Sequence, residues 1–162
     1  MKKIKEPMVL LMAEDDIDYY KITKDAVEQL SVKVDFRNVE DGEYLMDYLL
    51  RRGQYKDPAS SPLPDIIFLD LNMPRKSGLE ALKEIKSNYS LRQIPIIILT
   101  VSRDADNISL CYKLGANSFI TKPLGYPELV KAIESLESYW FKTVQLPPNA
   151  FPNQAADDGK IK

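Results

Sequence analysis

The chain has no histidine and a single cysteine, Cys111, among its 162 residues. The absence of histidine removes the commonest general base and metal ligand, and this chain cannot itself carry a phosphohistidine. One cysteine excludes an intrachain disulfide framework, and we expect Cys111 to pack as a small hydrophobic residue on a helix rather than to act as a redox switch. Any metal must be bound through oxygen, which favours a hard cation such as Mg²⁺.

Long apolar runs and basic clusters are also missing. No segment approaches the ~20 apolar residues of a membrane span, and the N-terminus lacks the apolar stretch of a secretion signal, so we expect a cytoplasmic protein with no membrane partner. No basic run exceeds two residues and the net charge is -2, which argues against a nucleic-acid partner. With 44% hydrophobic residues, the chain suits one domain with a sizeable core and a short appendage.

Five short apolar segments alternate with five segments of helical periodicity. The predicted strands are 8–12, 32–39, 66–69, 96–99 and 118–121. The second strand alternates apolar and polar residues, which is typical of a half-exposed edge strand, whereas the third is an unbroken apolar run typical of a strand buried on both faces. The predicted helices are 18–30, 42–51, 77–88, 105–114 and 127–140. This βα repetition predicts an α/β fold with a parallel sheet and helices on both faces.

Three local signals mark the predicted helix ends. Ser77 and Glu80 have the spacing of a capping box at a helix N-terminus. Gly115 follows the fourth helix as a C′ residue, and Pro127 stands in the first turn of the fifth.

Two segments depart from the βα repetition. Residues 53–64 are rich in loop formers and too long for an ordinary connection. We predict that they form an exposed insertion, either a partner-specific element or a tolerated loop extension. Residues 8–146 are expected to form the domain, and residues 147–162, rich in Pro, Asn and Asp, a disordered tail.

Large apolar residues gather at the end of the last predicted helix: Tyr139, Trp140, Phe141 and Leu146. Adjacent aromatic residues on a helix cannot all face one core. We therefore expect at least one to be exposed and these residues to mark a homodimer surface, with packing inside the monomer as the alternative.

Acidic residues follow the first and third predicted strands. They are Glu14, Asp15, Asp16 and Asp70. The carboxyl ends of parallel strands meet at one edge, where open α/β sheets bind ligands. Adjacent carboxylates repel one another unless a cation joins them, so Asp15 and Asp70, with the backbone carbonyl of Asn72, are predicted to hold Mg²⁺. The alternative for the acidic triplet is a solvated turn that caps the first helix through Asp16 or Asp18.

Thr100 ends the fourth predicted strand and Lys122 the fifth. Taken singly, the threonine is more typical of a turn and the lysine of a solvated surface. Beside Asp70, the hydroxyl and the ammonium group can both bind oxygens of a phosphoryl group. We predict that Asp70 attacks a phosphoryl donor in line while Mg²⁺ and Lys122 neutralise the transferring group, and that water can hydrolyse the resulting acyl phosphate.

With these residues in place, the chain resembles the receiver domain of two-component response regulators, the CheY-like family, over residues 8–141. Four motifs carry the resemblance: Leu-Met-Ala-Glu-Asp-Asp, Phe-Leu-Asp-Leu-Asn-Met-Pro, Ile-Leu-Thr and Phe-Ile-Thr-Lys-Pro. The resemblance implies a flavodoxin-like doubly wound (βα)5 sheet in the order 2-1-3-4-5. It also implies that Asp70 accepts its phosphoryl group from a sensor histidine kinase or a histidine phosphotransfer protein.

The resemblance also assigns roles to individual residues. Glu14 and Asp15 match the acidic pair of the family by register, with Asp15 rather than Asp16 as the direct Mg²⁺ ligand. Thr100 and Phe119 match its switch, in which the threonine moves toward the phosphoryl group and the aromatic ring turns inward. The alternative for Phe119 is an ordinary core aromatic residue.

A closer resemblance is to single-domain regulators paired with cyanobacterial and bacterial phytochromes. It rests on the long insertion before the third strand, the segment Ala-Asn-Ser-Phe-Ile-Thr-Lys-Pro and the segment Tyr-Trp-Phe-Lys-Thr-Val-Gln-Leu-Pro-Pro. It implies a phytochrome as the partner kinase. Because only about 20 residues follow the fifth helix, we expect output through partner binding or dimerisation rather than through an appended domain.

Other functional classes fit the sequence less well. An aspartate-nucleophile phosphatase would need a second aspartate two residues after Asp70, where Asn72 stands. A flavin- or nucleotide-binding protein would need a glycine- or hydroxyl-rich phosphate loop where the three carboxylates stand. A pseudo-receiver, acting as a phosphorylation-independent interaction module, is disfavoured because every site residue is present. We therefore expect a signalling switch that catalyses only its own phosphorylation and dephosphorylation.

Overall fold

The five predicted apolar segments form the strands of one parallel sheet. The computed structural model describes residues 7–148, and its strands are β1 Met8–Ala13, β2 Val34–Val39, β3 Ile66–Leu69, β4 Ile96–Thr100 and β5 Ser118–Thr121. Neighbouring strands are parallel throughout and follow the order β2-β1-β3-β4-β5. This order confirms the flavodoxin-like fold. It brings the carboxyl ends of β1, β3 and β4 side by side.

Five α-helices connect the strands: α1 Ile17–Glu28, α2 Gly42–Leu49, α3 Gly78–Ser87, α4 Ala105–Lys113 and α5 Tyr126–Leu136. The predicted capping box is present at the start of α3, where Ser77 and Glu80 exchange side-chain and backbone hydrogen bonds. Gly115 follows α4 with a left-handed φ of 109°. Within residues 7–148, no helix combines the length and the apolar composition that crossing a membrane requires.

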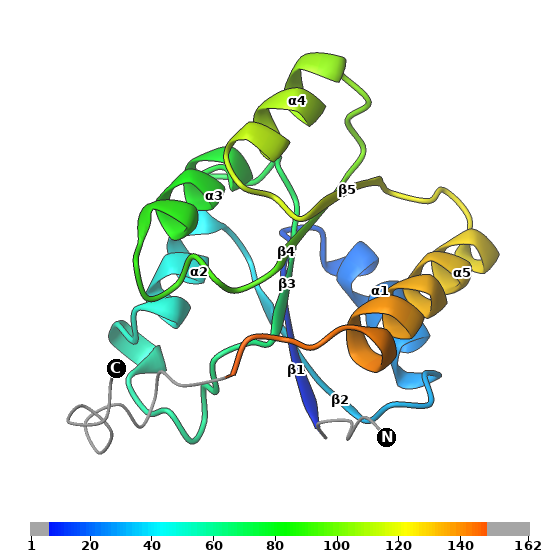
Figure 1. Cartoon of the computed structure of the whole chain (residues 1–162), viewed down its shortest axis with the longest axis horizontal. Coiled ribbons are helices and arrows are strands. Elements are labelled where there is room, and N and C mark those ends of the chain that lie inside the picture. Colours follow the sequence, from blue (N-terminus) through cyan, green and yellow to red (C-terminus); the bar gives the residue numbers. More distant parts are fainter. Residues whose placement is uncertain (1–6, 149–162) are drawn as a thin grey trace.

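The helices cover both faces of the sheet. Figure 1 shows α1 and α5 together on one face and α2, α3 and α4 on the other. Consecutive strand residues point to opposite faces, so Leu10 packs in the layer under α1 and α5, which we call the α1/α5 layer, and Leu11 packs in the α2–α4 layer. Cys111 is fully buried in the α2–α4 layer, as predicted for a small hydrophobic residue.

The two edge strands are less buried than the central three. The first five residues of β2 are only half-buried, which confirms the prediction of an edge strand from its alternating pattern. At the other edge, the Phe119 N–H of β5 donates a hydrogen bond to Tyr112 Oη of α4 at 3.1 Å. A side chain of α4 therefore covers part of the open edge of β5.

The segment 53–64 is anchored at its C-terminal end. It begins with a short 3₁₀ helix, Gly53–Tyr55, and residues 56–60 are exposed, as predicted for an insertion. Ser61 and Leu63, however, are buried, and the Tyr48 hydroxyl donates a hydrogen bond to the Pro62 carbonyl at 2.6 Å. The prediction of an exposed insertion is therefore wrong for residues 61–64, because they pack beside α2.

The last predicted helix, 127–140, is α-helical only as far as Leu136. After Leu136 the chain continues as a π-helix, Glu137–Thr143. The buried Glu137 carboxylate accepts hydrogen bonds from the Val32 N–H at 2.8 Å and from Ser31 Oγ at 3.0 Å. These bonds fasten the π-helix to the turn between α1 and β2.

The π-helix decides which C-terminal aromatic residues are accessible. Its wider turn places Phe141 in the α1/α5 layer at 2% exposure, so the prediction that Phe141 belongs to a dimer surface is wrong. Tyr139 is 55% exposed, which confirms that at least one aromatic residue faces outward. Trp140 and Leu146 are partly buried against the same layer. Most of the predicted tail, residues 149–162, lies outside the described residues.

Candidate functional site

Three strands deliver charged residues to the carboxyl edge of the sheet. Glu14 follows β1, Asp70 follows β3 and Lys122 follows β5, and all three are buried. Lys122 Nζ lies 2.7 Å from Glu14 Oε1 and 3.3 Å from Asp70 Oδ2. The lysine is therefore a buried partner of both carboxylates and not a solvated surface residue. The pairing with Lys122 offsets part of the cost of removing the two carboxylates from water.

Glu14 and Asp70 share the single ammonium group of Lys122, and this sharing determines the charge balance of the site. Burial raises the pKa of Glu14 to about 7. The negative charge of Asp70 adds to this increase in pKa, and the hydrogen bond from Lys122 opposes it. Burial disfavours the charged form of Lys122, but the carboxylates of Glu14 and Asp70 outweigh it and raise the pKa of Lys122. With both carboxylates ionised, the site carries one uncompensated negative charge, which a second cation can balance.

Asp15 extends this group toward solvent. One carboxylate oxygen from each of Glu14, Asp15 and Asp70 lies within 4.8 Å of the others, and Asp15 is exposed. The donor set contains only oxygen, which suits a hard divalent cation that keeps some of its water ligands. The Asn72 N–H faces Asp70 Oδ1 at 3.3 Å, so Asn72 adjoins the site, and ligation by its carbonyl stays a prediction.

The three acidic residues that follow β1 lie in two settings: Glu14 and Asp15 lie beside Asp70, and Asp16 lies at the N-terminus of α1. Asp16 is the N-cap of α1 and accepts hydrogen bonds from the Asp18 and Tyr19 N–H groups at 3.0 and 3.2 Å. The helix-capping interpretation therefore holds for Asp16, and metal ligation by Asp15 stays a prediction. Asp16 is engaged in capping α1, whereas Asp15 is the residue of the triplet that lies beside Glu14 and Asp70, which favours Asp15 over Asp16 as the predicted ligand.

The start of α3 packs directly against the backbone of Asp70. The Gly78 N–H donates to the Leu71 carbonyl at 2.9 Å. A Cβ at position 78 would overlap the Asp70 carbonyl oxygen and lie 2.7 Å from Leu71 Cα. Only glycine allows this approach, so the capped N-terminus of α3 fixes the backbone that carries Asp70.

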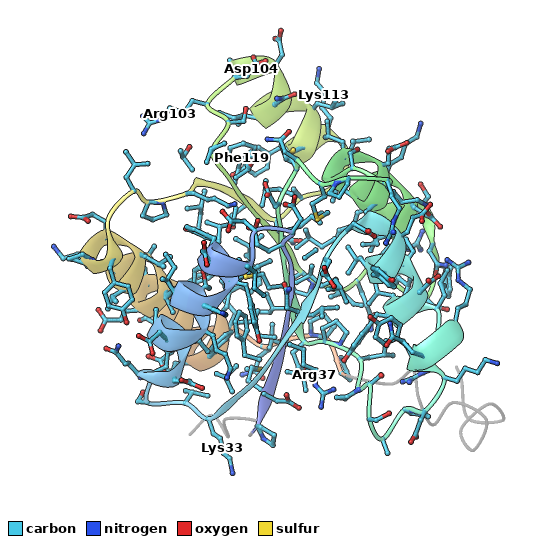
Figure 2. All side chains as sticks on the ribbon, turned by 180° about the vertical axis from the view of Figure 1, so that it is seen from behind. Lys33, Arg37, Arg103, Asp104, Lys113 and Phe119 are labelled. Carbon is cyan, nitrogen blue, oxygen red and sulfur yellow. The ribbon has the colours of Figure 1, made fainter. Side chains whose placement is uncertain are left out.

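Thr100 and Phe119 lie on one face of the sheet. Phe119 is the register partner of Ile98, and Thr100, two residues after Ile98, faces the same side. Phe119 is half-buried against the α2–α4 layer, and Figure 2 shows it beneath α4. Thr100 is fully buried, and its Oγ1 has no hydrogen-bond partner among the described residues. A buried hydroxyl without a partner is costly and marks a position where an incoming oxygen can bind.

One residue of the site was not anticipated from the sequence. Tyr19, on the first turn of α1, places its ring centroid 4.4 Å from Lys122 Nζ. The capping pattern at Asp16 puts residue 19 on the first turn of the helix. The contact itself depends on how α1 packs beside α5, and the sequence carries no local signal for that.

The family model of the response regulator receiver domain matches residues 10–134. The chain belongs to this family. Response regulator Rcp1 of Synechocystis sp. PCC 6803 is 35% identical to this receiver domain over 141 residues, which are 87% of this chain and 94% of that protein. The crystal structure of the Mn²⁺-bound form of Rcp1 matches with a TM-score of 0.81 at 34% identity, over 88% of this chain and 100% of that chain.

A second solved relative is the phosphorylated cyanobacterial phytochrome response regulator RcpA. It matches with a TM-score of 0.81 at 34% identity, over 87% of this receiver domain and 99% of that chain. These relatives confirm the predicted resemblance to phytochrome-associated regulators and make the chain a signalling domain. The Mn²⁺-bound relative and the oxygen donors of Glu14, Asp15 and Asp70 together indicate a divalent cation site.

Proposed function

We propose that Asp70 accepts a phosphoryl group from a phosphohistidine of a partner protein, and that the phosphorylated domain then signals. The observation that carries this proposal is the position of Lys122 Nζ, within ion-pair distance of both Glu14 and Asp70 in a buried site. A carboxylate can approach an anionic phosphoryl donor only when positive charge is already in place. Lys122 supplies that charge.

The chemistry is a single displacement at phosphorus. A carboxylate oxygen of Asp70 forms a bond to phosphorus while the P–N bond to the imidazole breaks, and the ring, whose other nitrogen takes a proton from solvent, leaves as neutral imidazole. Mg²⁺, held by Glu14, Asp15, Asp70 and the Asn72 carbonyl, would supply further positive charge at the transferring oxygens. The ammonium group of Lys122 pairs with one of these oxygens, and no general base is required. Water later hydrolyses the acyl phosphate.

Thr100 and Phe119 transmit the change in this proposal. The buried Thr100 hydroxyl, which lacks a partner, moves to donate a hydrogen bond to the new phosphoryl group. Phe119, half-buried on the same face, turns into the space that the threonine leaves. Phenylalanine carries no hydroxyl, so packing alone stabilises the turned ring.

The test is the intact mass of the chain after incubation with acetyl phosphate and Mg²⁺. We expect a gain of one phosphoryl group that requires Mg²⁺ and is absent in Asp70→Asn, because the amide is not a nucleophile toward phosphorus. Asp47→Asn is the matched control, since Asp47 is partly exposed on α2 and pairs with Arg52. No adduct in the parent chain, even with candidate kinases supplied, would leave the pseudo-receiver as the better description.

The proposed phosphodonor is a sensor histidine kinase of the phytochrome type or a histidine phosphotransfer protein, and the proposed location is the cytoplasm. Phytochrome response regulators among the relatives support this choice. Ile17 and Leu124 are 53% and 94% exposed and follow the carboxyl ends of β1 and β5. They offer a partner helix apolar contacts at the rim of the site.

We also propose that self-association contributes to output. Tyr139 and Trp140 line a surface hollow with Ile120 and Leu136 between β5 and α5, and the partly buried Leu146 packs against the same layer. Exposed apolar residues of this kind mark protein interfaces. Compared with the predicted surface, this one loses Phe141 and gains Ile120 and Leu136.

Tyr139→Glu is expected to weaken the dimer by about 30-fold, because a charge at the centre of an apolar interface costs as much as the loss of a hot-spot residue. Light scattering after size exclusion, with and without acetyl phosphate, measures the effect. The control is Tyr89→Glu, since Tyr89 is 82% exposed and lies outside the hollow. A parent chain that stays monomeric in both states contradicts the proposal, as does an equal effect of the control.

A further inference from the structure

Lys122 has a third close partner besides its two carboxylates. The ring centroid of Tyr19 lies 4.4 Å from Lys122 Nζ, well inside the range in which a cation is attracted to an aromatic face. The other two such contacts among the described residues, Arg75 over Tyr44 and Arg92 over Tyr89, include exposed side chains. Lys122 is buried, and a cation–π contact is stronger where water is excluded.

The backbone of Tyr19 is fixed on both sides. Its N–H donates to the Asp16 cap at 3.2 Å, and its carbonyl accepts a hydrogen bond from Thr23 Oγ1 at 2.7 Å. The ring packs against the α1/α5 layer. The first turn of α1 thus holds the ring in place without help from the lysine.

The hydroxyl of Tyr19 takes no part in this arrangement. Its Oη is buried and has no hydrogen-bond partner among the described residues. Burial, together with the negative charges of Glu14 and Asp70, raises the pKa of Tyr19, so the ring stays neutral. Removing a hydroxyl without a partner leaves no other group unsatisfied. The contact with Lys122 is therefore made by the aromatic ring of Tyr19 and not by its hydroxyl.

We propose that Tyr19 is a positioning residue whose ring holds the Lys122 ammonium group in place for phosphoryl transfer. The inference rests on the proposed function of Asp70. A neutral ring restrains Nζ without consuming its charge, whereas each carboxylate competes with the phosphoryl group for that charge. Without the ring, the ammonium can follow Glu14 and Asp70 through a wider range of positions, and fewer of them suit the incoming phosphoryl oxygens.

The experiment compares Tyr19→Leu and Tyr19→Phe in the full chain, using acetyl phosphate as the donor at saturating Mg²⁺. We expect Tyr19→Leu to slow phosphorylation of Asp70 about tenfold, which corresponds to about 1.4 kcal/mol of lost transition-state stabilisation. Tyr19→Phe keeps the ring and should restore the rate to within about twofold of the parent. Phenylalanines with increasing numbers of ring fluorines should slow the reaction stepwise, because fluorine withdraws electron density from the ring face.

Tyr20→Leu is the matched control. Tyr20 is the neighbouring residue on α1, is half-buried and stacks on Phe36 with a centroid distance of 5.6 Å. An equal loss of rate in Tyr20→Leu would assign the effect to the packing of α1. An unchanged rate in Tyr19→Leu, equally slow Leu and Phe variants at position 19, or no trend with fluorination would each overturn the role of the ring.

A second measurement separates this inference from the proposed function. The ring should shift the Lys122 ε-methylene proton resonances upfield in the parent chain, and Tyr19→Leu should abolish that shift. Loss of the shift in Tyr19→Phe would contradict the contact. A parent chain that shows the shift but forms no phosphoryl adduct would reject the proposed function, and with it the role in transfer, while leaving the contact itself established.

Discussion

Lys122→Ala is expected to slow phosphorylation of Asp70 by acetyl phosphate by roughly 100-fold or more, the usual loss when one preorganised electrostatic group is removed from an active site. Lys122 Nζ lies 3.3 Å from the acceptor carboxylate and 2.7 Å from Glu14. No other ammonium or guanidinium group lies within ion-pair distance of Asp70 in the part of the chain that the structure describes. The rate constant at saturating Mg²⁺, followed by intact mass, measures the loss.

The same substitution should also make stability depend on the cation. Without Lys122, the buried Glu14 and Asp70 carboxylates have no positive partner, which typically costs about 3 kcal/mol. Urea denaturation should show this loss in the presence of a chelator, and Mg²⁺ should recover part of it because it binds only the folded state.

Lys86→Ala is the matched control for Lys122→Ala. The Lys86 ammonium group donates to the Arg92 and Ile94 carbonyls at 2.8 Å each, and it is partly buried away from Asp70. This variant should lower stability and leave the rate of phosphorylation nearly unchanged. A similar loss of rate in both variants would show that Lys122 acts through general stability and not through its charge at the site.

Binding of Mg²⁺ is expected to weaken as the pH falls below about 7, the pKa to which burial raises Glu14. Below that pH the carboxyl group holds a proton that the cation must displace, so the dissociation constant should rise up to about tenfold for each further pH unit. Because the carboxyl group is already half protonated at pH 7, this corresponds to roughly 15-fold weaker binding at pH 5.5 than at pH 7. Isothermal titration calorimetry in buffers of different ionisation enthalpy measures both the affinity and the protons released.

The variant Glu14→Gln provides the control for this pH dependence. It should bind Mg²⁺ more weakly than the parent at pH 8 but with a flatter dependence on pH between 6 and 8. An unchanged slope in the variant would assign the titration to another group.

Stability without metal should change with pH in the opposite sense. Between the ordinary pKa of 4.5 and the raised value of about 7, the folded state holds more protons at Glu14 than the unfolded state does. Its contribution to stability is therefore present at low pH and is lost as the pH rises through about 7. Urea denaturation in a chelating buffer at pH 5 and at pH 8 resolves this contribution.

The elements predicted correctly are those with strong local signals. The bounds of β5 and the capping box of α3 follow from short-range patterns. Asp70 and Lys122 come together because the carboxyl ends of parallel strands must meet at one edge. The order of the strands was implied by the family resemblance, and the register of the sheet then confirmed it.

The features that the sequence could not reveal depend on contacts between distant segments. Phe141 is buried because a π-turn shifts it toward the α1/α5 layer, and the helical periodicity around it does not signal that shift. Residues 61–64 are buried because they meet α2, although their composition is that of a loop. The ring of Tyr19 reaches Lys122 across 103 positions of the chain only because of how α1 packs beside the sheet.

The π-helix is hydrogen-bonded to the α1–β2 turn, so the smallest segment that can fold as this domain must include it. The family match ends at residue 134, yet Glu137 satisfies the Val32 N–H and Phe141 fills part of the α1/α5 layer. A chain trimmed to the matched segment would leave a buried donor unpaired and expose the inner side of α5. Expression boundaries for this receiver should therefore extend through Leu146, whose side chain still packs on that layer.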